Sequence, residues 1–100
     1  MKTILSIALI TATLSASAIA SEELAKAKNC LTCHSAERKI VGPSYKEITA
    51  KRGAEKGAEA ALAAKIKNGS KGEWGQVPMP PNAVSDAEAA TLAKWVLTQK

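Results

Sequence analysis

The chain has 100 residues and a formal net charge of +5 at pH 7, with three aromatic residues and no phenylalanine. A domain of this size with so few large side chains has a marginal hydrophobic core. We therefore expect a group that is not encoded in the sequence to help fill the core. The basic balance suits an acidic partner surface. Nucleic acid is a poor candidate partner because the lysines are scattered rather than clustered with aromatic residues.

The first twenty residues have the pattern of an export signal. One lysine precedes an apolar run over residues 4–14, and the segment ends in the triplet Ala-Ile-Ala. That run is shorter than the ~20 residues a membrane-spanning helix requires, and the small-residue ending is typical of cleavage. We predict that residues 1–20 are a signal peptide removed after Ala20, or alternatively after Ala18. Residues 21–100 would remain as one domain without a membrane anchor, with the net charge lowered from +5 to +4 by the loss of one lysine.

Helical patterns follow in chain order, and the first covers residues 21–34. Ser21 is its expected N-cap, and acidic residues occupy its first turn. Its apolar stripe consists of Leu24, Ala27 and Leu31, which recur at three- and four-residue spacing. The pattern therefore predicts one continuous helix up to the end of a cysteine-rich motif.

The second and third helices are expected after a loop broken by Gly42 and Pro43. The second covers residues 45–52. The third covers residues 58–69, where strong helix formers precede an Asn-Gly ending that suits a left-handed cap. The stretch 70–84 contains three prolines and two glycines without helical periodicity, which predicts a loop with a rigid tip.

The last helix opens with a capping-box pattern, Ser85 followed three residues later by Glu88, and is expected to reach the terminus. Its apolar face mixes small and large side chains: Ala89, Leu92, Ala93, Val96 and, beside them, Trp95. Small residues permit close approach, so we expect the N- and C-terminal helices to cross. No stretch alternates at period two, and the predicted class is all-α with about four helices.

The run Cys30-Leu31-Thr32-Cys33-His34 contains both cysteines and the only histidine. A structural zinc site usually needs four ligands, and this run supplies three. A thioredoxin-like dithiol expects a preceding strand, and a disulfide leaves the histidine unexplained. The pattern C-x-x-C-H is the signature of covalent haem attachment. On a helix, positions three apart face the same way, so both sulfurs can bond one macrocycle while His34 turns toward its iron.

An iron bound by a histidine has a sixth position to fill, and Met79 is the candidate. A lone methionine is more often a core gap-filler, but this one lies in the run Val-Pro-Met-Pro-Pro-Asn. The flanking prolines prevent a helix and favour an extended conformation, which fixes the direction of the sulfur. His/Met ligation raises the reduction potential. With both axial positions occupied, the iron would have no open site for substrate, which favours an electron carrier over an enzyme.

These motifs together resemble the class I c-type cytochromes, in particular the short bacterial periplasmic kind that donates electrons to nitrite reductase. The resemblance is carried by KNCLTCH, KIVGPSYKEITAK and the run from KIKNGSKGEWGQVPMPPN to the terminus. It implies a small cytochrome c fold around one covalently attached haem c, bonded to Cys30 and Cys33, with His34 and Met79 as axial ligands. It also implies a periplasmic protein whose partners are redox proteins such as nitrite reductase and an upstream cytochrome donor. Nothing in the sequence demands more than a monomer.

The resemblance further implies supporting roles. The Pro43 carbonyl would accept the N–H of the axial histidine, and the Asn82 amide would contact the axial methionine sulfur. Trp74 would donate to a haem propionate. Lys65 would approach a propionate too, in place of an arginine in close relatives, which keeps the charge but loses the planar fork. The plainer alternatives are that Trp74 only covers the haem edge, Asn82 only shapes a turn, and Pro43 only breaks the loop.

Two other classes of function stay open at this point. One is a haem sensor or enzyme in which the sixth ligand is displaceable, and the other is a non-haem thiol-disulfide protein that uses Cys30 and Cys33. For the electron carrier, the lysines expected near the haem edge are Lys28, Lys39 and Lys71. Their charge would steer the encounter with an acidic partner.

Overall fold

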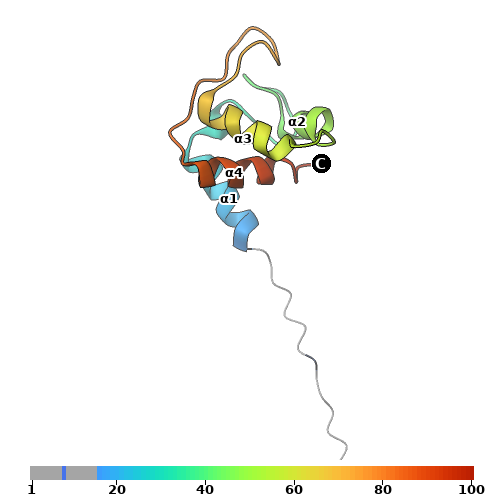
Figure 1. The fold of residues 1–100 in the computed structure, drawn as a ribbon, viewed down its shortest axis with the longest axis vertical. Helices are drawn as coiled ribbons and strands as arrows, with labels where there is room; N and C mark the ends of the chain where they lie inside the picture. The colour runs from blue at the N-terminus through green and yellow to red at the C-terminus, as the bar shows by residue number, and fades with distance from the viewer. Residues whose placement is uncertain (1–7, 9–15) are drawn as a thin grey trace, which may run out of the picture.

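The computed structural model describes residue 8 and residues 16–100, so most of the predicted signal peptide lies outside the described residues. The elements in order are α1 (Ala16–Ala27), the 3₁₀ helix η1 (Cys30–Thr32), α2 (Tyr45–Arg52), α3 (Ala58–Asn68) and α4 (Asp86–Val96). Over the described ranges, β structure is limited to two isolated bridges. The predicted all-α class with four α-helices is confirmed (Figure 1).

Helix α4 is the centre of the fold, because α1, α2 and α3 each contact it. Figure 1 shows α4 running between α1 and α3. Small side chains line this contact: Ala25 of α1 and Ala93 of α4 are fully buried, and Ala89 is 2% exposed. The predicted pairing of the terminal helices is therefore present, and close approach of small residues brings it about.

A second cluster of buried side chains joins α2 to the end of α4. Tyr45, Ile48 and Val96 form it, and Trp95 packs against it. The rings of Tyr45 and Trp95 meet edge to face with centroids 5.1 Å apart. Thr49 Oγ1 donates to the Val96 carbonyl at 2.9 Å, which ties the two helices together. One wall of the cavity described below rests on this cluster.

The first helix differs from its prediction at both ends. It begins upstream of Ser21, which is a buried residue inside α1 rather than its N-cap. It ends at Ala27, because Asn29 takes a left-handed conformation (φ 62°) that an α-helix does not continue through. Ala27 and Leu31 are therefore exposed, and Ala25 carries the buried face instead.

The caps of the later helices follow the sequence pattern closely. The expected capping box is present: Ser85 Oγ accepts from Glu88 N at 3.1 Å, and Glu88 Oε1 accepts from Ser85 N at 2.9 Å. Helix α4 ends at Val96, short of the expected terminus. Gly69 after α3 has a positive φ of 82°, but its ψ of 174° is extended rather than left-handed helical. This extended backbone leads directly into the loop over residues 70–84.

Candidate functional site

A cavity of about 570 Å³ lies between α3, α4 and the two segments that carry the predicted site residues. Its size is that of a typical ligand-binding site. The apolar residues in its walls include Ile48, Leu62, Ile66, Leu92 and Val96. Both cysteines, His34 and Met79 also line it, so the fold brings together residues that are 49 positions apart in sequence, from Cys30 to Met79.

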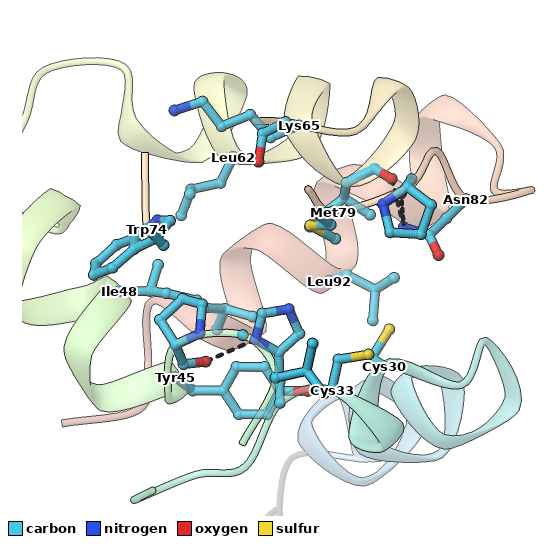
Figure 2. Close-up of a pocket in the computed structure, with 18 of the residues that line it drawn as sticks. Cys30, Cys33, Tyr45, Ile48, Leu62, Lys65, Trp74, Met79, Asn82 and Leu92 are labelled. Carbon is cyan, nitrogen blue, oxygen red and sulfur yellow. Dashed lines mark hydrogen bonds between the residues drawn. The ribbon is translucent and has the colours of Figure 1, made fainter. Parts of the chain in front are cut away.

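The cysteine motif lies on a 3₁₀ turn rather than on the α-helix that the sequence predicts. Cys33 N and His34 N both donate to the Cys30 carbonyl, at 3.2 and 2.9 Å. In 3₁₀ geometry, residues three apart are eclipsed. Cys30 and Cys33 therefore face the same way because of the 3₁₀ turn, and not because they share one face of an α-helix as expected. Figure 2 shows their sulfur atoms side by side at one edge of the cavity. Both are free thiols, and partial burial raises the pKa of Cys30.

The imidazole of His34 is held in place by its own segment. Its Nδ1 lies 2.7 Å from the Pro43 carbonyl oxygen, the hydrogen bond that the sequence analysis expects. A carbonyl can only accept, so Nδ1 carries the proton and Nε2 is left with a lone pair available to a metal. The Tyr45 ring stacks on the imidazole at 5.6 Å between centroids. A side chain at Gly42 would lie 2.6 Å from His34 Cε1, so the ring position requires glycine there.

Met79 enters the cavity from the opposite side, next to α3. Figure 2 shows its side chain on the α3 side and the cysteines on the α1 side. Ser70 and Met79 exchange both of their backbone hydrogen bonds, at 3.0 and 2.8 Å, which closes the base of the loop. Gly69 packs under this bridge, since a Cβ there would lie 2.6 Å from the Met79 carbonyl oxygen. The methionine loop is thus fastened to the end of α3.

The side-chain amide of Asn82 fastens the same loop. Its Nδ2 donates to the Ile66 carbonyl at 2.8 Å, with a longer contact of 3.4 Å to the Pro80 carbonyl. The amide therefore binds backbone of α3 and of its own loop. Its expected contact with the Met79 sulfur stays a prediction.

A group of charged side chains surrounds Trp74 at another part of the cavity. Lys65 donates to Glu73, and Arg52 Nη2 lies 3.5 Å from the same carboxylate. Lys51 Nζ stands 4.4 Å above the Trp74 ring in a cation–π contact. The ammonium of Lys65 lowers the pKa of Glu73. Lys65 and Trp74 both line the cavity, and Lys65 is paired with Glu73. Their expected contacts with haem propionates stay predictions.

Two residues of the site are absent from the sequence interpretation. Glu73 and Tyr45 both line the cavity. Tyr45 is 3% exposed, its hydroxyl has no hydrogen-bond partner among the described residues, and burial raises its pKa above the ordinary range. The sequence could have pointed to Glu73 through its position beside Trp74. It could have pointed to Tyr45 through its place at the start of a helix, directly after the Gly-Pro break.

The remaining predicted lysines differ in their surroundings. Lys28 and Lys71 line the cavity, whereas Lys39 does not. Lys28 Nζ donates to the Ala83 carbonyl at 3.0 Å, which joins the end of α1 to the segment before α4. Lys39 and Lys71 are exposed. The apolar side chains of Val41 and Val77, which line the cavity, are 49% and 65% exposed.

Comparison with known proteins decides among the alternatives. The model of the family described as Cytochrome c matches residues 18–100. The chain belongs to the cytochrome c family. It is 62% identical over 79 residues to cytochrome c-551 of Pseudomonas aeruginosa, covering 79% of this chain and 76% of that protein. It is 55% identical over 82 residues to cytochrome c-552 of Nitrosomonas europaea, covering 81% of this chain and 80% of that one.

Solved structures agree with this assignment. The crystal structure of wild-type Nitrosomonas europaea cytochrome c552 superimposes with a TM-score of 0.77 at 55% identity, covering 79% of this chain and 99% of that chain. The class 1 cytochrome MtoD of Sideroxydans lithotrophicus ES-1 reaches 0.68 at 28% identity, with coverages of 81% and 94%. The chain is therefore a small monohaem electron carrier with covalently bound haem c, not an enzyme. The non-haem thiol-disulfide alternative is excluded.

The residues around the cavity fit a covalently bound haem. Two free thiols point the same way, and the imidazole keeps Nε2 available because Pro43 binds Nδ1. The walls are predominantly apolar, as a macrocycle requires, and a thioether enters from the other side. Among residue 8 and residues 16–100, no three His, Cys, Asp or Glu side chains gather as a separate metal site. Within the same residues, no helix is long and apolar enough to span a membrane.

Proposed function

We propose that this cytochrome c is a periplasmic carrier of single electrons in which His34 and Met79 are the axial ligands of the iron and Cys30 and Cys33 hold the haem by thioether bonds. The haem supplies a one-electron iron couple. The observation that carries the proposal is the pairing of an imidazole with a free Nε2 and a loop-held methionine in one apolar cavity. Two protein ligands leave no position for substrate.

The chain's own residues keep this arrangement rigid. Pro43 holds the imidazole through Nδ1, which fixes the ring and increases its basicity. Ser70 and Asn82 hold the methionine loop against α3 through the contacts described above. Apolar walls exclude water, so little solvent reorganises when an electron enters or leaves. Rigid ligation on both sides suits fast electron exchange rather than catalysis.

The polar wall of the cavity is the proposed place for the haem carboxylates. Trp74 lies there with its indole N–H as a donor, and Lys65 supplies a positive charge. Asn82 is proposed to support the methionine ligand, mainly by fixing the loop to the Ile66 carbonyl. Pro43 is proposed as the partner that orients the axial histidine. These roles come from the family resemblance and from the positions of the residues around one cavity.

We further propose that residues 1–20 direct export and are removed, so that residues 21–100 act in the periplasm. The family match, which begins at residue 18, supports this division. N-terminal sequencing of the protein purified from a bacterial periplasm tests it. The expected first residue is Ser21, or Ile19 if the alternative site is used. A chain that still begins at Met1 would contradict the proposal.

Nitrite reductase and an upstream cytochrome are the proposed partners, bound briefly through small interfaces. Lys39 and Lys71 are exposed, and so are Val41 and Val77 on the rim of the cavity. Exposed positive charge suits steering, and exposed apolar side chains suit docking. Electron-transfer rates to an acidic partner should fall several-fold as ionic strength rises from about 0.01 M to about 0.1 M, where the Debye length shortens from about 30 to about 10 Å. Rates that stay flat over this range would exclude steering.

Carbon monoxide tests whether Met79 occupies the sixth position or leaves it open, as in a haem sensor with a displaceable ligand. The reduced wild-type protein should show no rapid change in its absorption on mixing with the gas, because Met79 occupies the sixth position. Met79→Ala should bind the gas quickly, which proves that the assay detects an open position. Rapid binding by the wild-type protein would favour the sensor.

A further inference from the structure

Glu73 is the only carboxylate among the described residues that line the cavity. The other charged residues of this lining are Lys28, Lys65 and Lys71, all positive. A cavity proposed to receive a haem with two carboxylates therefore already contains one from the protein itself. The carboxylate of Glu73 would therefore add a third negative charge close to the haem.

The carboxylate of Glu73 is fixed by cations from two helices. Lys65 of α3 donates to Oε1, and Arg52 of α2 lies 3.5 Å away. The side chains of Glu73, Lys65 and Arg52 are 27%, 29% and 25% exposed, so solvent screens these charges less than it screens a surface pair. The loop backbone at Glu73 is fixed too, because its carbonyl accepts from Lys51 Nζ at 3.4 Å. The negative charge is therefore held at one place on the cavity wall.

A second group belongs to the same cluster and lies outside the cavity. Glu55 binds Nη1 of Arg52 at 2.9 Å, while Glu73 faces Nη2 of the same guanidinium. Glu55 is 49% exposed and is not part of the cavity lining. The two glutamates thus share one arginine, but only Glu73 faces the proposed haem.

We propose that Glu73 is a positioning residue that lowers the reduction potential of the haem by placing a fixed negative charge on the cavity wall and by engaging Lys65. This inference rests on the proposed function. Oxidation transfers one electron from the iron to the redox partner and leaves one more positive charge in the cavity. A nearby carboxylate stabilises that charge, and it also occupies an ammonium that would otherwise favour the reduced state.

The test is potentiometric titration of the haem-loaded protein. At a fixed ambient potential, Glu73→Gln should raise the ratio of reduced to oxidised protein roughly threefold to tenfold, where tenfold corresponds to about 59 mV for a one-electron couple. Glu73→Asp, which keeps the charge, should restore most of the wild-type ratio. Glu55→Gln removes the same charge from the other side of Arg52 and should change the ratio less than twofold. Equal shifts in the Glu73→Gln and Glu55→Gln variants would overturn the proposal, because net charge alone would then explain them.

Lys65→Gln keeps the proposal falsifiable if loss of Glu73 prevents folding. Removing this cation should shift the ratio toward the oxidised protein, opposite to Glu73→Gln, and an unchanged ratio would overturn the inference. The far-red absorption band of iron(III) bonded to methionine is recorded for every variant. Its absence from the wild-type protein would count against the proposed ligands. A normal band with an unchanged potential in Glu73→Gln would count against the role of Glu73 alone.

Discussion

The two sides of the proposed haem cavity are built in different ways. On the histidine side, the hydrogen bonds that hold the imidazole and close its loop come from nearby sequence: Pro43 binds His34 at 2.7 Å, and Gly42 N donates to the Cys33 carbonyl at 2.8 Å. On the methionine side, the loop that carries Met79 depends on a separate helix, through Asn82 Nδ2 and the Ile66 carbonyl of α3. One side is a short closed loop, and the other is a long loop fastened at its ends.

This difference implies a different stability for the two proposed ligands, His34 and Met79. A short loop closed by hydrogen bonds loses little entropy on ordering, whereas a long loop without helix depends on its anchors. Covalent attachment through Cys30 and Cys33 would further restrict the histidine side. We therefore expect the Met79 side to open first when the protein is heated or destabilised, while His34 stays in place.

The largest effect is expected from filling the space beside His34. A methyl group in Gly42→Ala would lie 2.6 Å from Cε1 of the imidazole, so the ring must move or the loop must shift. We expect the free energy of unfolding to fall by about 2 to 3 kcal/mol and the histidine ligand signature to be disturbed. Thermal unfolding and the magnetic resonance spectrum of the haem-loaded protein measure both. Gly72→Ala, which meets nothing within 4 Å, should leave the histidine signature unchanged.

A smaller difference between variant and control is expected at the base of the methionine loop. Gly69 and Gly57 both have a positive φ, 82° and 76°, so alanine strains the backbone at either position. The strain is larger at Gly69, whose ψ of 174° lies in a region that only glycine normally adopts, than at Gly57, whose ψ of 18° is left-handed helical. Only at Gly69 would the new Cβ also collide, at 2.6 Å from the Met79 carbonyl oxygen. Gly69→Ala should therefore cost about 1 to 2 kcal/mol more than Gly57→Ala and weaken the far-red band. Equal losses of stability in the two variants, with the band intact, would show that Gly69 does not hold the loop.

The smallest effect is expected from loosening one anchor. Asn82→Ala removes the donor to the Ile66 carbonyl, which should lower the free energy of unfolding by about 1 kcal/mol. The far-red band should then disappear at a lower temperature than in the wild-type protein, with the histidine side intact. The control is Asn68→Ala, at an exposed position on α3, the helix that contains Ile66. Simultaneous loss of both ligands in Asn82→Ala would contradict the difference between the two sides.

Much of this architecture is predictable because it depends on local chemistry. Helices α2 and α3 and the start of α4 are correctly predicted from strong helix formers, Gly breaks and the Ser85 capping box. The hydrogen bond from His34 to Pro43 is expected from the family resemblance rather than from the residues alone, and the structure contains it. The first helix is predicted less well, because Asn29 ends it by adopting a left-handed conformation that its sequence neighbours do not reveal.

The unpredicted parts of the site depend on contacts between distant segments. Glu73 and Arg52 lie 21 positions apart, and only the folding of α2 against the loop brings them together. The buried hydroxyl of Tyr45 depends on the packing of α2 against Trp95. From the sequence alone, Glu73 and Arg52 look like ordinary surface residues, and Tyr45 looks like an ordinary core residue. Their place at the cavity becomes evident only in three dimensions.

Met79 is proposed to bind the haem iron on the side opposite His34, so that no coordination position stays open. One absorption spectrum tests this ligation most directly. The oxidised wild-type protein should show the weak far-red band of iron(III) bonded to methionine, together with a low-spin c-type haem spectrum. Met79→Ala should lack the band and keep the covalently attached haem. A band that survives in Met79→Ala, or that is missing from the wild-type protein, would contradict the assignment.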